Sequence, residues 1–381
     1  MKNSADSSAL SSIPILLYEK NGVLPWHKAM IDQFCLYGKK HGIHITFFNH
    51  WEDILQFHSI HCLIVIGENI EWLRDIILHL CSHPLHIILI SGHLHGNYSN
   101  ISQIQFDQKV FVEYSLNLLK KHGRFRTAFI GPQKNDTSDA IKADTFALSV
   151  SPSDIYPISD SLDASFDSFF KNVDLYDSVI CTNDLVAVYF MKRCRMCGIS
   201  IQEQLYLIGN SNLWISSHTV PSLTTCAYDL KSLVLVALQL YQNFCQYPDA
   251  SAMNIVIKPT MIERASTGNR FQSKNMPQDS FISHKLSENM PDINRYIQYP
   301  EIQRIKELDL ALTYRSPEDH LILQGLCAGK SYEKIADLAL MPLDTVKNRI
   351  KKLYRQLNIH TKQELIDFAA EYQIHFAPYE S

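Results

Sequence analysis

The stretch Phe111-Val-Glu-Tyr-Ser-Leu-Asn-Leu-Leu-Lys-Lys-His-Gly-Arg-Phe-Arg-Thr-Ala-Phe-Ile-Gly131 decides the fold class, because it reads as a helix followed at once by a buried strand. Phe111, Tyr114 and Leu118 recur at helical spacing, and a basic turn ending in glycine at position 123 is typical of a helix C-terminus. Residues 127–131 form a short apolar run of the kind that makes an inner strand. The stretch therefore predicts an α/β unit.

The same alternation extends in both directions, from Ile13 to about Thr267. Apolar runs separated by amphipathic stretches predict parallel sheets with helices on both faces. The runs fall into two sets, with a break near residues 100 to 125, which predicts two α/β lobes. They are Ile13-Leu17, Ile43-Phe48, Cys62-Gly67, Ile87-Ser91, Thr127-Gly131, Ser178-Thr182 and Leu205-Gly209.

The periodicity fails between residues 268 and 300, where Asn, Ser, Gln, Lys and Pro dominate, and this predicts a linker. Closely spaced helical segments follow, with no strand between them. The predicted organisation is a polar tail (1–12), a two-lobed α/β domain (13–267), the linker (268–300) and an all-α four-helix domain (301–381).

Composition places the chain among ordinary globular proteins, with 381 residues, 46% hydrophobic and 19% charged. No apolar run approaches the roughly 20 residues of a membrane helix, so we expect no membrane association. The first twelve residues lack the order of a signal peptide, which favours a cytoplasmic protein. The nine cysteines are scattered, which favours reduced thiols. The net charge of -4 means that any nucleic-acid contact requires a local basic patch.

Such a patch occurs in the C-terminal helices. Ser316-Pro-Glu-Asp319 has the pattern of a helix start. Helices are then expected over about 331–338 and 343–357, separated by a short turn, which is helix-turn-helix spacing. Ala336 and Val346 are the small and apolar residues that the contact between two such helices needs.

The predicted third helix separates apolar and basic residues. Val346, Ile350, Leu353 and Leu357 recur at the spacing of one buried face. The stretch from Lys347 to Arg355 contains five basic residues and no acidic one, as insertion into a DNA major groove requires. A solvated basic face on a small helical domain is the simpler alternative.

Three segments here resemble the LuxR-type DNA-binding domain over about 60 residues. They are Gly329-Lys-Ser-Tyr-Glu-Lys-Ile-Ala336, Asp344-Thr-Val-Lys-Asn-Arg-Ile350 and Leu353-Tyr-Arg-Gln-Leu-Asn-Ile359. The resemblance implies double-stranded DNA as a partner and dimerisation through the last helix. It departs from the family at Pro342, where a serine cap is usual. The expected DNA-binding residues are Thr345, Lys347, Asn348, Arg349, Lys351, Lys352 and Arg355.

The α/β part resembles the effector domain of LacI/GalR-type repressors, whose fold periplasmic sugar-binding proteins share. Among the segments that carry the likeness are Phe106-Asp107, Ser178-Val-Ile-Cys-Thr-Asn-Asp184 and Pro221-Ser-Leu-Thr-Thr225. The resemblance implies a small effector, such as a sugar, bound between strand ends. Helix capping is the alternative role for the two aspartates. The expected effector residues are Trp26, which we place in the first strand–helix loop, with Asp107, Lys142, Asn183, Asp184 and Ser211.

The leading hypothesis is a homodimeric transcription regulator in which a small effector controls a C-terminal helix-turn-helix. The alternative is a ligand-binding protein that acts through protein contacts of its helical module. An enzyme is not expected, because no acid-base or nucleophile set converges. No cofactor or metal site is expected either, since Cys194-x-x-Cys197 lies inside a predicted helix without a second ligand pair.

Overall fold

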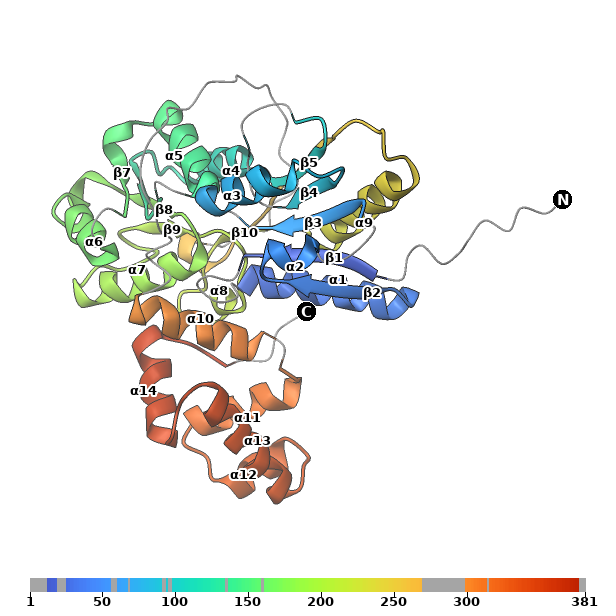
Figure 1. Cartoon of the computed structure of the whole chain (residues 1–381). Coiled ribbons are helices and arrows are strands. Elements are labelled where there is room, and N and C mark those ends of the chain that lie inside the picture. The colour runs from blue at the N-terminus through green and yellow to red at the C-terminus, as the bar shows by residue number, and fades with distance from the viewer. Residues whose placement is uncertain are drawn as a thin grey trace. The chain divides into compact units, whose positions relative to one another are not determined.

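A computed structural model of the chain describes residues 12–18, 25–55, 60–67, 69–90, 94, 98–133, 136–158, 161–268, 299–313 and 315–376. The chain divides into two compact units, each assembled from separate segments (Figure 1). Unit 1 comprises Met1–Val112, Gln133–Thr145 and Ala227–Thr260. Unit 2 comprises Glu113–Pro132, Phe146–Cys226 and Met261–Ser381.

Unit 1 is built on a six-stranded sheet in the order β11-β5-β4-β3-β1-β2, and every neighbouring pair is parallel. Parallel pairing requires crossover connections, which the intervening helices provide. The strands are β1 (Ser12–Leu17), β2 (His44–Phe48), β3 (Cys62–Ile66), β4 (His86–Ile90), β5 (Ile101–Phe106) and β11 (Asn254–Ile257). The helices are α1 (Pro25–His41), α2 (Trp51–Leu55), α3 (Ile70–Leu80) and α9 (Leu230–Gln246).

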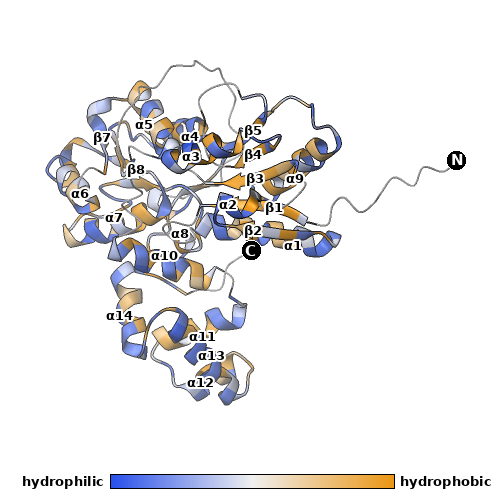
Figure 2. Ribbon diagram, in the orientation of Figure 1, coloured by the Kyte–Doolittle hydropathy of each residue, from blue (hydrophilic) through white to orange (hydrophobic). Residues whose placement is uncertain are grey.

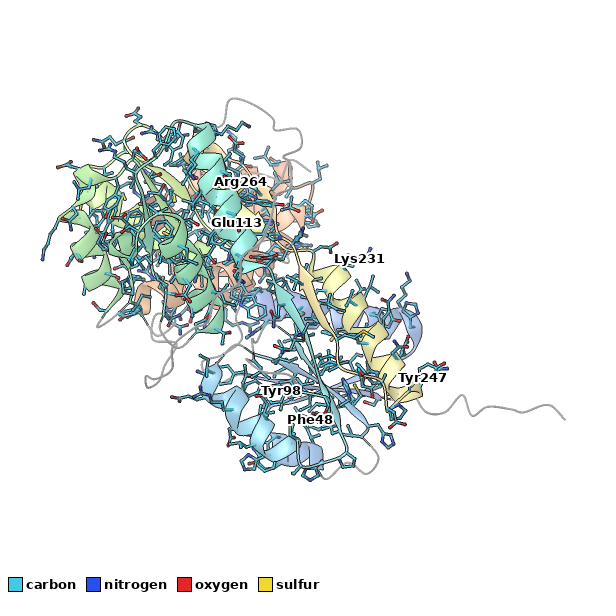
Figure 3. All side chains as sticks on the ribbon, turned by 90° about the horizontal axis from the view of Figure 1, so that it is seen from above. Phe48, Tyr98, Glu113, Lys231, Tyr247 and Arg264 are labelled. Carbon is cyan, nitrogen blue, oxygen red and sulfur yellow. The ribbon has the colours of Figure 1, made fainter. Side chains whose placement is uncertain are left out.

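Alternate residues of these strands supply two separate cores. Ile13 and Ile15 of β1 join Phe34 of α1 and Phe244 of α9 on one face, whereas Leu16 joins α2 and α3 on the other. Figure 2 shows the strands as predominantly hydrophobic, and Lys231 and Tyr247 mark the two ends of α9 in Figure 3. This is the doubly covered parallel sheet that continuous apolar runs predict.

Unit 2 contains a second parallel sheet, in the order β7-β6-β8-β9. Its strands are β6 (Thr127–Ile130), β7 (Ile155–Tyr156), β8 (Ser178–Cys181) and β9 (Tyr206–Ile208). Its helices include α6 (Leu162–Phe170), α7 (Asp184–Met196) and α8 (Trp214–His218). The boundary between the units falls within four elements: α4 (Gln108–Lys121), α5 (Thr137–Ser149) and the paired strands β10 (Thr225–Ala227) and β12 (Thr260–Ile262).

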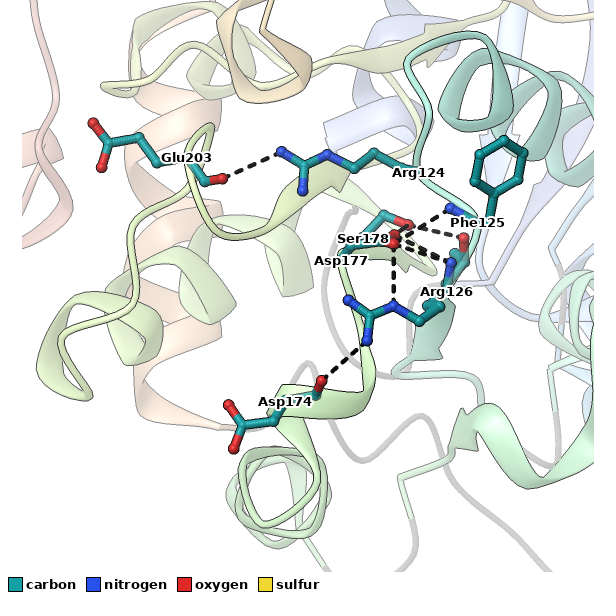
Figure 4. Close-up of polar contacts among 8 residues, drawn as sticks. Arg124, Phe125, Arg126, Asp174, Asp177, Ser178 and Glu203 are labelled. Atoms are coloured by element: carbon teal, nitrogen blue, oxygen red, sulfur yellow. Dashed lines mark hydrogen bonds and ion pairs between the residues drawn. The ribbon is translucent and has the colours of Figure 1, made fainter.

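One carboxylate fixes the start of two central strands of unit 2 (Figure 4). Asp177, which precedes β8, accepts hydrogen bonds from the backbone N–H groups of Phe125 and Arg126, which precede β6. The Nε of Arg126 and the hydroxyl of Ser178 also donate to it. The contacts with residues 125 and 126 hold the starts of the two strands side by side, where Thr127 pairs with Ser178.

Five helices form a C-terminal helical module, which belongs to unit 2. Its last helix packs against α7, where the Lys192 ammonium lies 2.6 Å from the Glu371 carboxylate and 5.2 Å from the centre of the Tyr372 ring. The helices are α10 (Pro300–Leu312), α11 (Pro317–Cys327), α12 (Tyr332–Leu338), α13 (Leu343–Gln356) and α14 (Lys362–Tyr372).

The structure confirms the α/β class, the parallel sheets and all seven predicted strands. Sequence reasoning missed five further strands, namely β5, β7, β10, β11 and β12, and the first helix of the module, α10. Most of the predicted linker and of the N-terminal tail lies outside the described residues. Within the described part, no helix has the length and apolar character needed to cross a bilayer.

Candidate functional site

Helix α13 buries one face and exposes the other. Val346, Ile350 and Leu353 are at most 3% exposed and face the rest of the module, as their spacing predicts, whereas Leu357, predicted on the same face, is only half-buried and caps the end of the helix. Pro342 occupies the cap position without a side-chain hydrogen bond, whereas Ser316 caps α11 and Thr361 caps α14 through theirs. The start of α13 therefore depends on packing more than on capping.

Close approach of α11 and α12 positions α13. A Cβ atom at Gly325 of α11 would lie 2.7 Å from the Ile335 side chain, so only glycine allows this contact. Ala336 of α12 is buried, in accordance with the predicted need for a small residue. The turn that follows includes Leu340 at φ 52°, a left-handed conformation that ends α12 abruptly.

Six of the seven predicted DNA-binding residues are exposed on α13. We call the surface that they form the basic face. Within the described residues, Lys347, Lys351 and Arg355 form no salt bridge, and they recur every four residues along one side of the helix. The exposed residues are Thr345, Lys347, Asn348, Lys351, Lys352 and Arg355.

Arg349 has a different position from the other six. Its guanidinium donates to the Asp319 carboxylate at 2.9 Å and to the Ser316 hydroxyl at 3.0 Å. Asp319 is 9% exposed, so the ion pair is partly shielded from water. Arg349 thus joins α13 to the start of α11, and its charge is already balanced within the module.

A hollow of about 450 Å³ adjoins the basic face at its C-terminal end. Lys347, Lys351 and Arg355 line it together with Tyr332 of α12 and His360. These cations supply positive charge and N–H donors around an open hollow. A phosphate group suits such a place, because its oxygens are negatively charged and accept hydrogen bonds.

Two predicted effector residues of unit 1 lie near an aromatic cluster. Trp26 lies in the first turn of α1, which corrects its predicted place in the preceding loop. Its ring contacts Phe106 edge to face, with centroids 6.3 Å apart, and Phe106 packs on Tyr228 at 4.3 Å. Asp107 follows Phe106 and accepts a hydrogen bond from Val110 N–H, so it caps α4. All three rings are half-buried, and a flat apolar ligand face packs well on such surfaces.

Lys142, the third predicted effector residue of unit 1, is 4% exposed, and its ammonium lies 2.8 Å from the Asp139 carboxylate. The other oxygen of Asp139 accepts from Gln133 N–H. The side-chain amide of Gln133 and the hydroxyl of Thr137 are buried and make no hydrogen bond within the described part of the chain. Sequence reasoning missed both, and their residue types gave no signal. Buried polar groups of this kind normally bind water or a ligand.

The three predicted effector residues of unit 2 have separate roles. Asn183 caps α7 by accepting from Val186 N–H. Asp184 is fully buried, and its carboxylate accepts from the Thr225 hydroxyl at 2.7 Å and from Leu213 N–H at 2.8 Å. Asp184 is therefore not the cap of this helix, because the cap is its neighbour.

Burial raises the pKa of Asp184 to about 6, against the opposing effect of these hydrogen bonds. Ser211 is half-exposed, and its φ of 115° is a conformation that residues with a side chain rarely adopt.

A family model of periplasmic binding protein-like domains matches residues 117–267. The sequence matches no curated protein. The structure is similar to that of the transcriptional regulator CelR in complex with cellobiose, with 11% identity, a TM-score of 0.59, and coverage of 67% of this chain and 84% of that one.

It is also similar to a LacI-type transcription regulator from Bifidobacterium animalis, with 15% identity, a TM-score of 0.54, and coverage of 67% and 99%. A periplasmic binding protein/LacI regulator from Alkaliphilus metalliredigens, in complex with D-xylulofuranose, has 19% identity, a TM-score of 0.54 and the same coverage. The chain therefore contains a periplasmic binding protein-like domain with the fold of LacI-type transcription regulators.

Proposed function

We propose that the chain is a cytoplasmic, homodimeric transcription regulator in which the α/β part senses a small effector and a LuxR-type helix-turn-helix, formed by α12 and α13, binds double-stranded DNA. The observation that carries this proposal is the exposed basic face of α13 opposite a fully buried apolar face. An exposed helix with this distribution fits a major groove, with Asn348 and the lysines near base edges and the other cations near phosphates. The fold shared with LacI-type regulators supports the sensing role.

Selection of the full-length protein on a random duplex library tests DNA binding. We expect a two-fold symmetric site, because a homodimer presents two copies of α13. Lys347→Ala, Lys351→Ala and Arg355→Ala combined should abolish enrichment. A matched control changes Lys39, Lys40 and Lys120 to alanine, which alters the net charge equally on exposed residues of α1 and α4. Equal behaviour of the two triple variants would contradict the proposal.

For the effector, we propose a small polyhydroxylated molecule, as in the sugar complexes among the similar structures. The aromatic cluster around Trp26 offers a stacking surface, and Gln133 and Thr137 offer hydrogen-bonding groups that are not yet engaged. The other proposed contacts are Asp107, Lys142, Asn183, Asp184 and Ser211. A thermal-shift screen with ribose, cellobiose and related sugars tests this, because a ligand selective for the folded state raises the Tm. Trp26→Ala should remove the shift.

Docking of a partner protein is the alternative function of the helical module, and one observation favours it. A second hollow, of about 320 Å³, is lined by buried apolar side chains, among them Leu308 and Phe368, and by exposed acidic ones, among them Glu364 and Asp367. If this hollow carries the function, the basic-face variant regulates normally in cells, whereas Asp367→Lys does not.

A further inference from the structure

Helix α8 follows directly on a strained loop, Gly209–Leu213, which contains the proposed effector residue Ser211. Ser211 has a φ of 115°, which disfavours a residue with a side chain, and Asn212 follows at φ 48°, in the left-handed region that asparagine adopts more readily than most residues. The loop is nevertheless held firmly, since Leu213 N–H donates to the buried carboxylate of Asp184 at 2.8 Å. Its conformation is therefore imposed by its neighbours.

Dense packing connects the loop to α8 itself. A Cβ atom at Gly209 would lie 2.2 Å from the Asp184 carboxylate, so the loop has no free space on that side. Arg264, labelled in Figure 3, donates to the Asn212 side chain at 2.6 Å and to the Ser216 hydroxyl at 3.2 Å. A shift of the loop must consequently move α8, because close-packed groups transmit displacement.

Helix α8 also contacts the first two helices of the module. Ile215 N–H donates to the Asp309 carboxylate of α10 at 2.8 Å, and Asp309 is 1% exposed. The indole of Trp214 stacks on His320 of α11, with centroids 5.6 Å apart. Helix α8 thus bonds to α10 and packs on α11.

The end of α8 pairs with the segment that follows α14. His375 N–H donates to the carbonyl of His218 at 2.7 Å, and Val220 N–H donates to the carbonyl of Gln373 at 3.0 Å. Thr219 and Ile374 form an antiparallel bridge between these bonds. Both ends of this short helix are therefore attached to the helical module that carries the basic face.

We propose that α8 is the mechanical link of the protein, which passes a shift of the Gly209–Leu213 loop through Asp309 and residues 373–375 to the helical module. The proposal rests on the proposed function, in which an effector contacts Ser211 of this loop and the module binds DNA. The ligand changes DNA affinity only as far as it binds one arrangement of α8 better than the other. Couplings of this kind typically change affinity by about 5- to 150-fold.

Hydrogen exchange of the full-length protein, followed by mass spectrometry, tests the link without an effector. Ser211→Gly removes the side chain that disfavours φ 115° and so changes the conformational preference of the loop. We expect exchange in α8, α10 and residues 373–375 to change by about 5-fold or more. Gln202→Gly is the matched control, since Gln202 has φ 89° in another turn of unit 2. A change confined to the loop, or no change, would overturn the proposal.

A second substitution tests the route. In an Asp309→Ala background, Ser211→Gly should no longer affect α10, whereas in an Asp309→Asn background, which keeps an acceptor for Ile215 N–H, the effect should persist. Equal effects in all backgrounds would show that Asp309 does not carry the coupling. Should Asp309→Ala fail to fold, the Asp309→Asn comparison remains, and Trp214→Leu, which removes the stack on His320, tests the contact of α8 with α11 in the same way.

DNA affinity of the same variants separates this inference from the function on which it rests. Wild-type protein that binds no DNA refutes the proposed function, yet the exchange data still decide whether α8 is a link. Wild-type DNA binding that Ser211→Gly leaves unchanged, with unchanged exchange in α10, refutes the link alone.

Discussion

The basic face of α13 and the junction around α8 are both rich in charge, but they use it in opposite ways. On α13, Lys347, Lys351 and Arg355 are exposed, and the hollow beside them is open. At the junction, Asp184 and Asp309 are almost fully buried, and both accept backbone hydrogen bonds from the start of α8 or the residue before it. Exposed charge is available to an external partner, whereas buried charge orders the chain around it.

The largest expected effect comes from Asp184→Ala, which removes the acceptor of Thr225 and Leu213 at the centre of the junction. Leaving two buried donors without a partner should lower the free energy of unfolding of unit 2 by about 3 kcal/mol. Urea denaturation measures this. Asp184→Asn, which keeps one acceptor oxygen, should lose less. Exposed Asp167→Ala is the control, and an equal loss there would show that burial does not make the difference.

Loss of the three basic-face cations should reduce DNA affinity by about 100-fold and weaken its salt dependence, since each neutralised phosphate contributes close to one unit of slope. Titration of the selected duplex at two or more salt concentrations measures both. A loss of affinity with an unchanged salt slope would contradict phosphate contact. Stability should not change, because none of the three side chains is buried.

The junction should respond to pH. Burial, with the nearby carboxylate of Asp184, raises the pKa of Asp309 to about 7. The folded state therefore holds this proton more tightly than the unfolded state, whose aspartate pKa is about 4. The resulting stabilisation is complete below about pH 4 and is lost as the pH rises through 7.

Asp309→Asn isolates this contribution. The variant should be close to wild type at about pH 4 and more stable than wild type at pH 8, by about 1 kcal/mol or more. Melting curves across this range measure it. Exposed Asp367→Asn serves as the control, and an identical pH profile for wild type and Asp309→Asn would show that the carboxyl is not protonated in the folded protein.

The smallest expected effect belongs to Arg349, the cation of α13 that pairs within the module. Arg349→Ala should lower stability by about 1 kcal/mol, because the partly shielded pair with Asp319 is lost. DNA affinity should fall far less than for Lys351→Ala. Binding assays on the two variants, made side by side, compare them. Equal losses of DNA affinity for the two variants would show that Arg349 contacts DNA as well.

Much of the fold could be predicted because β1, β3 and β4 are continuous apolar runs, the pattern of a strand buried on both faces. Strand β5 was missed because Ser102 and Gln103 interrupt its apolar pattern. Both are buried, and His86 and Leu94 satisfy their side chains. A polar residue in a core strand is acceptable only through such tertiary partners, which no local pattern reveals.

The candidate site could also be predicted only in part. The spacing of Val346, Ile350 and Leu353 determines which side of α13 is exposed, so the basic face followed from periodicity alone. The partner of Arg349 could not be predicted in this way, because Asp319 lies thirty residues earlier in the sequence. The internal role of Asp184 was equally hidden, since it depends on Thr225 and on a loop amide.

The pairing of residues 373–375 with the end of α8 has a consequence for synthesis on the ribosome. The α/β part of unit 2 is translated long before its own contacts are complete, because α7 and α8 must wait for α10, α14 and the segment that follows them. A nascent chain therefore exposes the apolar surfaces around Trp214 until residue 375 and beyond have left the exit tunnel. In a molecule with the arrangement described here, the helical module that carries the basic face therefore packs on an α/β part of unit 2 that has already folded.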